Sequence, residues 1–403
     1  MITMKVTMIA REFPPNVYGG AGVHLKYLVQ ELTKLMKVEV RCFGDQDIKQ
    51  ENLKVKGYKP WSKLKQAGNR RLSVALSTLS VDLSVVQDAI DSDIVHTHTW
   101  YAAFAGYLAK LLYKVPLVVT CHSLEPLRPW KEEQLGRGYQ LSSWVEKLAI
   151  EAADKIIGVS NTMKEDILKY FNVPADRVAV IHNGIDLNKW KKVTTNNTQK
   201  QYGVKYPYVL FVGRTTKQKG MIYLLDAADY IEPGVQIVCC TSAPDTKEVE
   251  AEITRKVACK KNVLWINKLL KEEQYIELYS GATVFTCPSI YEPFGIINLE
   301  AMACETPVVA SAVGGIKEVV VPEETGILVE PANPKQLADG INRLLRDRAL
   351  ASIFGKNGRK RVEKYFGWPL IAQQTKNLYE SIIADFLRRR QSPAATDFKQ
   401  CAR

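Results

Sequence analysis

Short apolar runs rich in β-branched residues alternate along the chain with longer stretches of helical periodicity. In the first half these runs predict strands at residues 5–10, 38–43, 93–98, 116–122, 155–160 and 177–182. Helical patterns fill the gaps, for example at residues 23–35 and 141–153. Regular alternation of strands and helices favours a parallel sheet covered by helices on both faces. The first half is therefore expected to form a doubly wound α/β domain.

The same alternation starts again after a polar segment without periodicity, residues 191–205, which is expected to be a linker. Strands are then predicted near residues 208–213, 235–241, 262–267, 283–287 and 307–311, and helices at 220–231, 245–258, 271–281, 296–304 and 334–347. A chain of 403 residues is also long enough for two domains of ordinary size. We therefore expect two Rossmann-like domains, residues 1–190 and 206–368.

A last helical stretch follows a break at Phe366–Pro369. Its length and position predict that residues 369–390 leave the second domain and pack back on the first, with 391–403 as a flexible tail. Doubly wound sheets bind ligands outside the carboxyl ends of their strands. The active site is therefore expected in a cleft between the two domains.

Two strand-to-helix loops of the second domain carry opposite charges. Arg214 and Lys219 follow the predicted strand at 208–213, whereas Glu292 and Glu300 follow the strand at 283–287. A guanidinium and an ammonium suit phosphate oxygens, and carboxylates accept hydrogen bonds from sugar hydroxyls. Together the loops predict a ligand with both phosphates and hydroxyls, such as a sugar nucleotide. A solvated basic loop and a helix-surface carboxylate are the alternatives.

Two predicted helix starts offer backbone N–H groups to an anion. One contains Phe294, Gly295 and Ile296, and the other follows the glycine-rich turn with Gly19 and Gly20. Glycine allows close backbone approach, although such a turn is often only structural. Neither the first-strand turn nor the 213–220 segment matches an established dinucleotide or phosphate-loop motif.

All five histidines precede residue 183, and several stand at predicted strand ends. His122 closes the strand at 116–122, His96 and His98 close another, and His24 lies one turn into the first helix. A zinc site is conceivable, but no motif shows established metal-ligand spacing. No metal and no other cofactor are therefore expected.

The net charge of +12 raises the hypothesis of nucleic-acid binding. The only dense basic run is Arg388–Arg390, and no nucleic-acid module is recognisable, so no such partner is expected. The longest apolar runs have strand length, which predicts no membrane span. Eight scattered cysteines without a C-x-x-C pair and an N-terminus without a signal-peptide pattern favour a cytoplasmic protein.

The motif Gly213-Arg-x4-Lys-Gly220, combined with Glu292-x7-Glu300, resembles the retaining GT-B glycosyltransferases of family 4. The resemblance extends over about residues 1–388. Segments 11–24, 122–139 and 181–186 are similar, more narrowly, to the actinobacterial-type glycogen synthase and alpha-maltose-1-phosphate synthase subfamily. One departure is Arg137, where the subfamily pattern has glycine.

The resemblance implies a retaining glucosyltransferase, a monomer or homodimer, that moves glucose from ADP-glucose or UDP-glucose to an α-1,4-glucan, as a glycogen synthase does. Transfer to glucose 1-phosphate, which gives maltose 1-phosphate, and another family 4 sugar transfer are alternatives. A nucleotide-sugar epimerase can share the two-lobed fold, and a non-catalytic binding protein is a further class.

The resemblance also implies residue roles. The catalytic residues would be His122, Glu292, Arg214 and Lys219. The donor would be bound by Gly19, Gly20, Arg214, Lys219, Glu292, Phe294, Gly295, Ile296 and Glu300. The acceptor would be bound by Arg128, Lys131, Tyr139 and His24.

Overall fold

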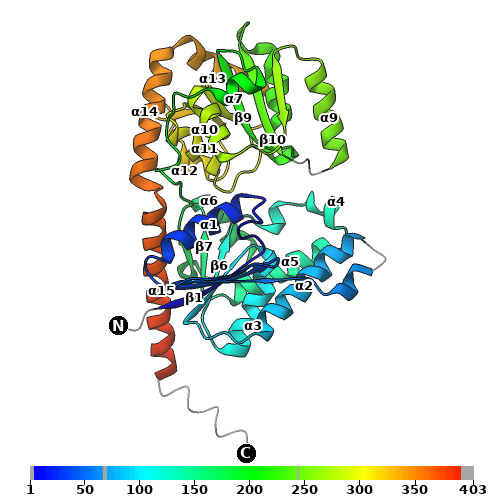
Figure 1. Ribbon diagram of the computed structural model, residues 1–403, viewed down its shortest axis with the longest axis vertical. Helices are drawn as coiled ribbons and strands as arrows, with labels where there is room; N and C mark the ends of the chain where they lie inside the picture. The colour runs from blue at the N-terminus through cyan, green and yellow to red at the C-terminus, as the bar shows by residue number, and fades with distance from the viewer. Residues whose placement is uncertain (1–3, 67–69, 243, 245, 392–403) are drawn as a thin grey trace, which may run out of the picture. The chain divides into compact units, whose positions relative to one another are not determined.

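The computed structural model describes residues 4–66, 70–242, 244 and 246–391, which divide into two compact units (Figure 1). Unit 1 contains the chain up to Val159, Met163–Ile181 and the chain from Pro369. Unit 2 contains Ser160–Thr162 and His182–Trp368. Residues 191–205, expected to be a linker, therefore lie within unit 2.

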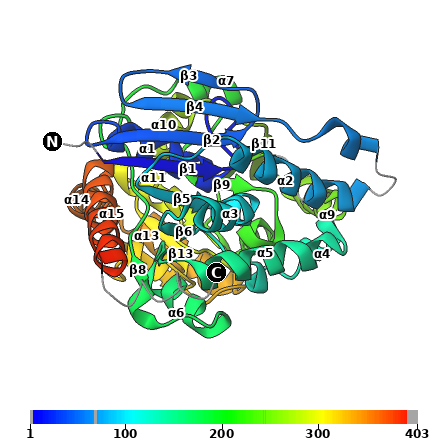
Figure 2. The same cartoon turned by 90° about the horizontal axis from the view of Figure 1, so that it is seen from below.

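Unit 1 is built on an eight-stranded sheet in which all neighbouring strands are parallel except β3 and β4. The strand order is β3 (Asp47–Lys49), β4 (Leu53–Tyr58), β2 (Lys37–Phe43), β1 (Lys5–Ala10), β5 (Ile94–His98), β6 (Leu117–Cys121), β7 (Lys155–Gly158) and β8 (Val178–Val180). Figure 2 shows β3 and β4 together at one edge of this sheet. Neither strand was predicted from the sequence, because β3 has only three residues and exposed lysines interrupt the apolar pattern of β4.

The helices of unit 1 cover both faces of the sheet. They are α1 (Gly20–Leu32), α2 (Arg70–Gln87), α3 (Ala103–Tyr113), α4 (Lys131–Leu135), α5 (Gly138–Ala152), most of α6 (Asn161–Tyr170) and nearly all of α15 (Trp368–Gln391). Helices α2, α3 and α5 pack against one another on one face, and α1 lies on the other (Figures 1 and 2). The central strands between them are buried, as β5 and β6 show at every position.

Helix α15 contributes a buried side chain to the sheet of unit 1. The Tyr379 hydroxyl lies 2.5 Å from Nδ1 of His96 on β5, and both side chains are buried. The expected tail 391–403 falls outside the described residues apart from Gln391. Among the residues that the structure describes, no helix combines the length and apolar character needed to cross a membrane.

Unit 2 contains a six-stranded parallel sheet. Its order is β11 (Val263–Asn267), β10 (Gln236–Ser242), β9 (Tyr208–Arg214), β12 (Val284–Cys287), β13 (Val308–Ser311) and β14 (Gly326–Val329). The edge strand β14 was not predicted, because its four residues give too short a run to stand out. The order reverses direction at β9 and β12, which is the point where such sheets bind ligands.

The helices of unit 2 are α7 (Asn197–Tyr202), α8 (Met221–Ala227), α9 (Lys247–Ala258), α10 (Glu272–Gly281), α11 (Ile296–Ala303), α12 (Ile316–Val319), α13 (Pro334–Arg346) and α14 (Arg348–Tyr365). Helix α8 packs against α9 and α13, whereas α11 packs against α10 and α14. Helix α7 lies within the expected linker. Its Thr198 and Gln199 are buried because both hydrogen-bond to Glu277 on α10.

Candidate active site

The two charged loops of unit 2 lie side by side because they follow adjacent strands. The Lys219 ammonium, after β9, is 2.5 Å from the Glu292 carboxylate, after β12. The backbone N–H of Ile290 donates to the Gln218 carbonyl, and the Gln218 amide donates to the Tyr291 carbonyl, both at 3.0 Å. The two loops therefore hold one another in a fixed arrangement.

Two glycines allow neighbouring segments to approach the loop after β12 closely. Gly220 has a φ of +69°, and a Cβ there would lie 1.9 Å from the carbonyl oxygen of Pro288. Gly314 has a φ of +49°, and a Cβ there would lie 2.0 Å from the carbonyl oxygen of Glu292. Both positions need a left-handed backbone and a missing side chain, which only glycine provides without strain.

Glu292 is 6% exposed, and its carboxylate has two side-chain partners among the described residues. It accepts hydrogen bonds from Lys219 at 2.5 Å and from the Ser289 hydroxyl at 3.3 Å. An ammonium and a carboxylate in direct contact suit a ligand whose phosphate and hydroxyl groups are close together, because each group of the ligand finds a charged partner. The site therefore presents both parts that a sugar-phosphate linkage requires.

Glu300 lies on α11 and accepts a hydrogen bond from the Tyr279 hydroxyl at 3.0 Å. Burial raises the pKa of Glu300 to about 7, although the bond from Tyr279 opposes the shift. The carboxyl group thus changes its charge close to neutral pH. The residue as a whole is half-buried.

The remaining donor residues predicted in unit 2 have different surroundings. Arg214 is the last residue of β9 and is half-buried. Phe294 is 2% exposed, and its ring packs near those of His182 and Phe366. Gly295 caps α11 with a φ of +94°, and Ile296 is the first residue of the helix. Phe294 therefore contributes to the core, and only its backbone is suited to a ligand.

The glycine-rich turn of unit 1 is organised by Glu12, which the sequence analysis did not single out. Its carboxylate accepts hydrogen bonds from the backbone N–H groups of Tyr18, at 2.7 Å, and Gly19, at 3.0 Å. A Cβ at Gly22 would lie 2.5 Å from the same carboxylate oxygen. The amide of Gly19 thus already serves an internal anion, whereas Gly20 begins α1.

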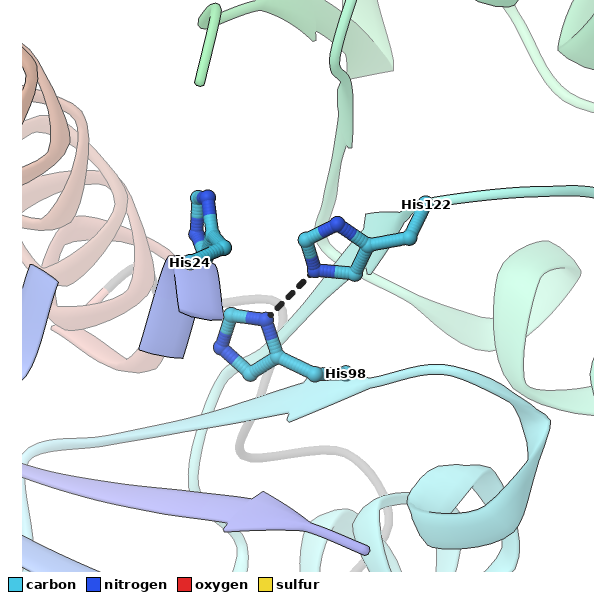
Figure 3. Close-up of side chains that lie close together, drawn as sticks. All are labelled: His24, His98 and His122. Atoms are coloured by element: carbon cyan, nitrogen blue, oxygen red, sulfur yellow. Dashed lines mark hydrogen bonds between the residues drawn. The ribbon is translucent and has the colours of Figure 1, made fainter. Parts of the chain in front are cut away.

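Three histidines from separate elements of unit 1 come together (Figure 3). His24 lies on α1, His98 ends β5, and His122 follows β6. Nδ1 of His98 is 3.1 Å from Nε2 of His122, and the His24 ring centroid is 4.7 Å from that of His122. Burial lowers the pKa values of His98 and His122 well below the usual range.

A fourth histidine, His96, lies beneath this group with its ring centroid 4.2 Å from that of His98. Its two ring nitrogens contact the Tyr379 hydroxyl at 2.5 Å and the Thr120 hydroxyl at 2.6 Å. Burial lowers its pKa to about 3. His96 is therefore a structural residue that joins β5, β6 and α15.

Within the predicted acceptor segment 122–139, a buried carboxylate organises the chain. Glu125 is 1% exposed and accepts hydrogen bonds from the Lys131 ammonium at 2.6 Å and the Ser142 hydroxyl at 2.8 Å. The Tyr139 hydroxyl donates to the backbone carbonyl of Glu125 at 2.5 Å. Lys131 and Tyr139, predicted to bind the acceptor, thus have partners inside the protein.

The other members of this segment differ in exposure. Arg128 is half-buried and donates to the Ser123 hydroxyl at 3.1 Å, whereas Arg137 is exposed. Glu146 on α5 accepts a 2.7 Å hydrogen bond from the backbone N–H of Glu125. Burial, followed by the neighbouring Glu125 charge, raises the pKa of Glu146 to about 8.

Four residues of these sites were missed by the sequence analysis: Glu12, His98 as a partner of His122, Glu125 and Glu146. The sequence did offer a signal for His98. It ends β5, and His122 follows the neighbouring strand β6. The three carboxylates carried none, because a glutamate with an internal partner has the same sequence pattern as one on the surface.

Comparisons with known proteins assign the family. Residues 18–189 match the model for Glycosyltransferase Family 4, and residues 194–361 match the model for Glycosyl transferases group 1. An alpha-maltose-1-phosphate synthase from Mycolicibacterium smegmatis is 45% identical over 397 residues, which cover 94% of this chain and 100% of that protein. A glycogen synthase from Mycobacterium tuberculosis is 27% identical, with 93% of this chain and 94% of that protein covered.

The fold has solved relatives as well. Sucrose-phosphate synthase from Thermosynechococcus elongatus superposes with a TM-score of 0.81 at 26% identity, with 95% of this chain and 100% of that chain covered. Anabaena HepE, solved in complex with UDP-glucose, has a TM-score of 0.77 at 22% identity, with 94% of this chain and 100% of that chain covered. The chain therefore has the GT-B fold and belongs to glycosyltransferase family 4, which makes it a hexosyltransferase that depends on a nucleotide sugar.

Proposed function

We propose that this enzyme transfers glucose from ADP-glucose or UDP-glucose to glucose 1-phosphate, with retention of configuration, and forms maltose 1-phosphate. Support comes from the 45% identity to proteins named alpha-maltose-1-phosphate synthase, against 27% to those named glycogen synthase. The sequence analysis put the α-glucan acceptor first, and the comparisons favour its alternative.

The observation that carries the donor assignment is the contact between Lys219 and Glu292, at 2.5 Å. In our proposal Arg214 and Lys219 bind the diphosphate, Glu292 binds hydroxyls of the transferred glucose, and Glu300 binds the ribose diol. Negative charge grows on the diphosphate as its bond to the sugar breaks, so fixed cations there stabilise the transition state. Gly20, at the start of α1, is proposed to approach the diphosphate.

The reaction breaks the bond between the anomeric carbon and the diphosphate oxygen. A new bond forms between that carbon and an acceptor hydroxyl oxygen, and the hydroxyl proton passes to the leaving diphosphate. A two-step mechanism would need a carboxylate nucleophile paired with an acid. Glu292 is instead bound to Lys219, which supports attack from the face that the leaving group vacates. This step needs no metal, and His122 is proposed to contact the donor sugar.

For the acceptor, Arg128 is the best-placed cation of the 122–139 segment. It is half-buried and donates to the neutral Ser123 hydroxyl, whereas the Lys131 ammonium is bound to Glu125. A guanidinium suits the phosphate of glucose 1-phosphate. A neutral glucan offers no phosphate for it, so Arg128 supports the smaller, charged acceptor.

The test is to assay ADP-glucose and UDP-glucose, each with glucose 1-phosphate or glycogen, and to identify the products by mass spectrometry. We expect maltose 1-phosphate with either donor, and a kcat/KM for glucose 1-phosphate well above that for glycogen chain ends. Chain elongation of glycogen without maltose 1-phosphate would overturn the acceptor assignment. Loss of activity in excess chelator would overturn the metal-free step.

The proposed location of the enzyme is the cytoplasm. Free thiols at all seven described cysteines support it.

A further inference from the structure

The residues His24, His98 and His122, here called the three-histidine site, lie close enough together to be candidate ligands of one metal ion. One ring nitrogen of each lies within 4.8 Å of the other two. The rings come from a helix and from the ends of two adjacent strands, so three rigid elements position them (Figure 3). The spacing along the chain resembles no metal motif, and therefore only the fold brings the three rings together.

The distance between two of the rings suits two ligands of one ion. Nδ1 of His98 and Nε2 of His122 are 3.1 Å apart and share a hydrogen bond in which either nitrogen is the donor. In a tetrahedral site with Zn–N bonds of about 2.0–2.1 Å, two ligand nitrogens are about 3.3 Å apart. The distance between the two nitrogens thus already suits a zinc site. To bind the ion, both rings must turn from facing one another to facing the ion, and His24 must approach.

A second observation concerns the other nitrogen of His98. Nε2 of His98 is buried and has no hydrogen-bond partner among the described residues, and the residue is 1% exposed. A buried polar atom without a partner is unfavourable. The neighbouring His96 differs, since both of its nitrogens are bound by hydroxyl groups. No hydrogen bond to a described residue thus fixes Nε2 of His98, so the His98 ring is free to turn toward an ion shared with the other two histidines.

The chemistry of the ligands selects the ion. Imidazole nitrogens suit zinc and similar transition metals, whereas magnesium and calcium require oxygen ligands. Three protein nitrogens leave a fourth position open. His122 is half-buried, so solvent has access to the site from its side.

We propose that His24, His98 and His122 bind one Zn²⁺ ion, and that the bound ion and the sugar substrate exclude one another. The second part rests on the proposed function, because His122 is there assigned to the donor sugar and His24 to the acceptor. The ion is an inhibitor in this scheme and takes no part in the transfer step.

The binding test uses the full chain with Cys259→Ser and Cys401→Ser, because Cys259 is an exposed thiol and Cys401 lies outside the described residues. After treatment with chelator, the protein is titrated with Zn²⁺ by calorimetry and with Co²⁺ by visible absorption. We expect one ion per chain with micromolar or tighter affinity, and the intense d–d bands of a four-coordinate cobalt site.

Two variants and one control make the assignment specific. His98→Asn and His24→Gln should each weaken binding at least tenfold, whereas His182→Gln, in unit 2, should bind as the parent does. Circular dichroism and thermal unfolding establish that each variant is folded, and His24→Gln serves if His98→Asn does not fold. Binding of equal affinity in the folded variants, or no ion taken up at micromolar concentration, overturns the proposal.

An assay of glucosyl transfer distinguishes failure of the metal-site proposal from failure of the proposed function. Micromolar Zn²⁺ should inhibit glucosyl transfer at least tenfold, and chelator should restore it. Inhibition that persists in folded His98→Asn overturns mutual exclusion. A chain that binds Zn²⁺ at the three-histidine site but transfers no sugar under any condition refutes the proposed function and leaves the metal site supported.

Discussion

The ammonium of Lys131 lies 2.6 Å from the carboxylate of Glu125, and both side chains are buried. Burial lowers the pKa of Lys131, while the charge of Glu125 opposes that shift. Both charges of such a pair have lost their contact with water, so leaving either one buried without the other is unfavourable. Lys131 therefore has a structural role in the 122–139 segment, and our proposal assigns the acceptor phosphate to Arg128 instead.

We predict that Lys131→Met destabilises the protein by about 3–5 kcal/mol, because the substitution leaves Glu125 as a buried charge without its partner. The measurement is the free energy of unfolding in urea. Adding Glu125→Gln should recover part of the loss, and Lys217→Met, at an exposed lysine, is the control. Near-normal stability together with a raised KM for glucose 1-phosphate would instead return Lys131 to the acceptor.

Arg128→Gln is expected to raise the KM for glucose 1-phosphate by roughly 10–100-fold, since a hydrogen bond to a charged group contributes about 1.5–3 kcal/mol. The KM for ADP-glucose should not change. Arg137→Gln removes an exposed cation of the same segment and is the matched control. Equal effects of the two substitutions would argue that general positive charge, rather than a specific contact, attracts the acceptor.

Lys219→Ala and Glu292→Gln should each lower kcat by about 10²–10³, because each removes a fixed group beside the developing charge. Steady-state kinetics with ADP-glucose and glucose 1-phosphate measure the effect. Lys217→Ala, two residues from Lys219 and exposed, should keep a kcat within a few-fold of the parent. If both site variants retain normal kcat, the donor assignment in unit 2 is wrong.

The raised pKa of Glu300 predicts that donor binding depends on pH. Its pKa is raised to about 7 by burial, so the carboxylate, which we propose accepts bonds from the ribose diol, forms only as the pH rises through 7. The KM for the donor should therefore fall between pH 6 and 8, and Glu300→Gln should abolish this trend. If the KM for the donor still falls with pH in Glu300→Gln, another titrating group causes the trend.

The raised pKa of Glu300 also predicts how the free energy of unfolding depends on pH. Between the usual pKa of 4.5 and about 7, the folded chain binds more protons at Glu300 than the unfolded chain does. The free energy of unfolding should therefore fall as the pH rises through this window, and the slope should be smaller in Glu300→Gln. Urea unfolding at a series of pH values measures both slopes, and equal slopes would contradict the assignment.

Glu318 should change the pH dependence of stability in the opposite direction, because its pKa is lowered rather than raised. Burial alone would raise its pKa, but hydrogen bonds from His182, Asn161 and Thr162 hold it at about 2. Its stabilising contribution is complete above the usual pKa of 4.5 and is lost as the pH falls toward 2. Glu318→Gln should destabilise unit 2 at pH 7 and flatten the acid limb of the stability curve. An unchanged acid limb would show that other carboxylates dominate it.

The fold follows closely from local patterns where strands are buried on both faces. The predicted strand at 5–10 coincides with β1, and the central strands of both sheets begin within one residue of their expected positions. The patterns missed β3, β4 and β14, although the edge strands β8 and β11 were predicted. β3 and β14 have only three and four residues, and exposed lysines interrupt β4, so none of them gives a long continuous apolar run.

The sequence by itself determined that loops after β9 and β12 carry opposite charges, because residue types and their distance from an apolar strand are local properties. Only the tertiary structure decided which side chains meet. It placed Lys219 against Glu292 and His98 against His122. The reason is that strand order in a parallel sheet, rather than distance along the chain, determines which strand ends become neighbours.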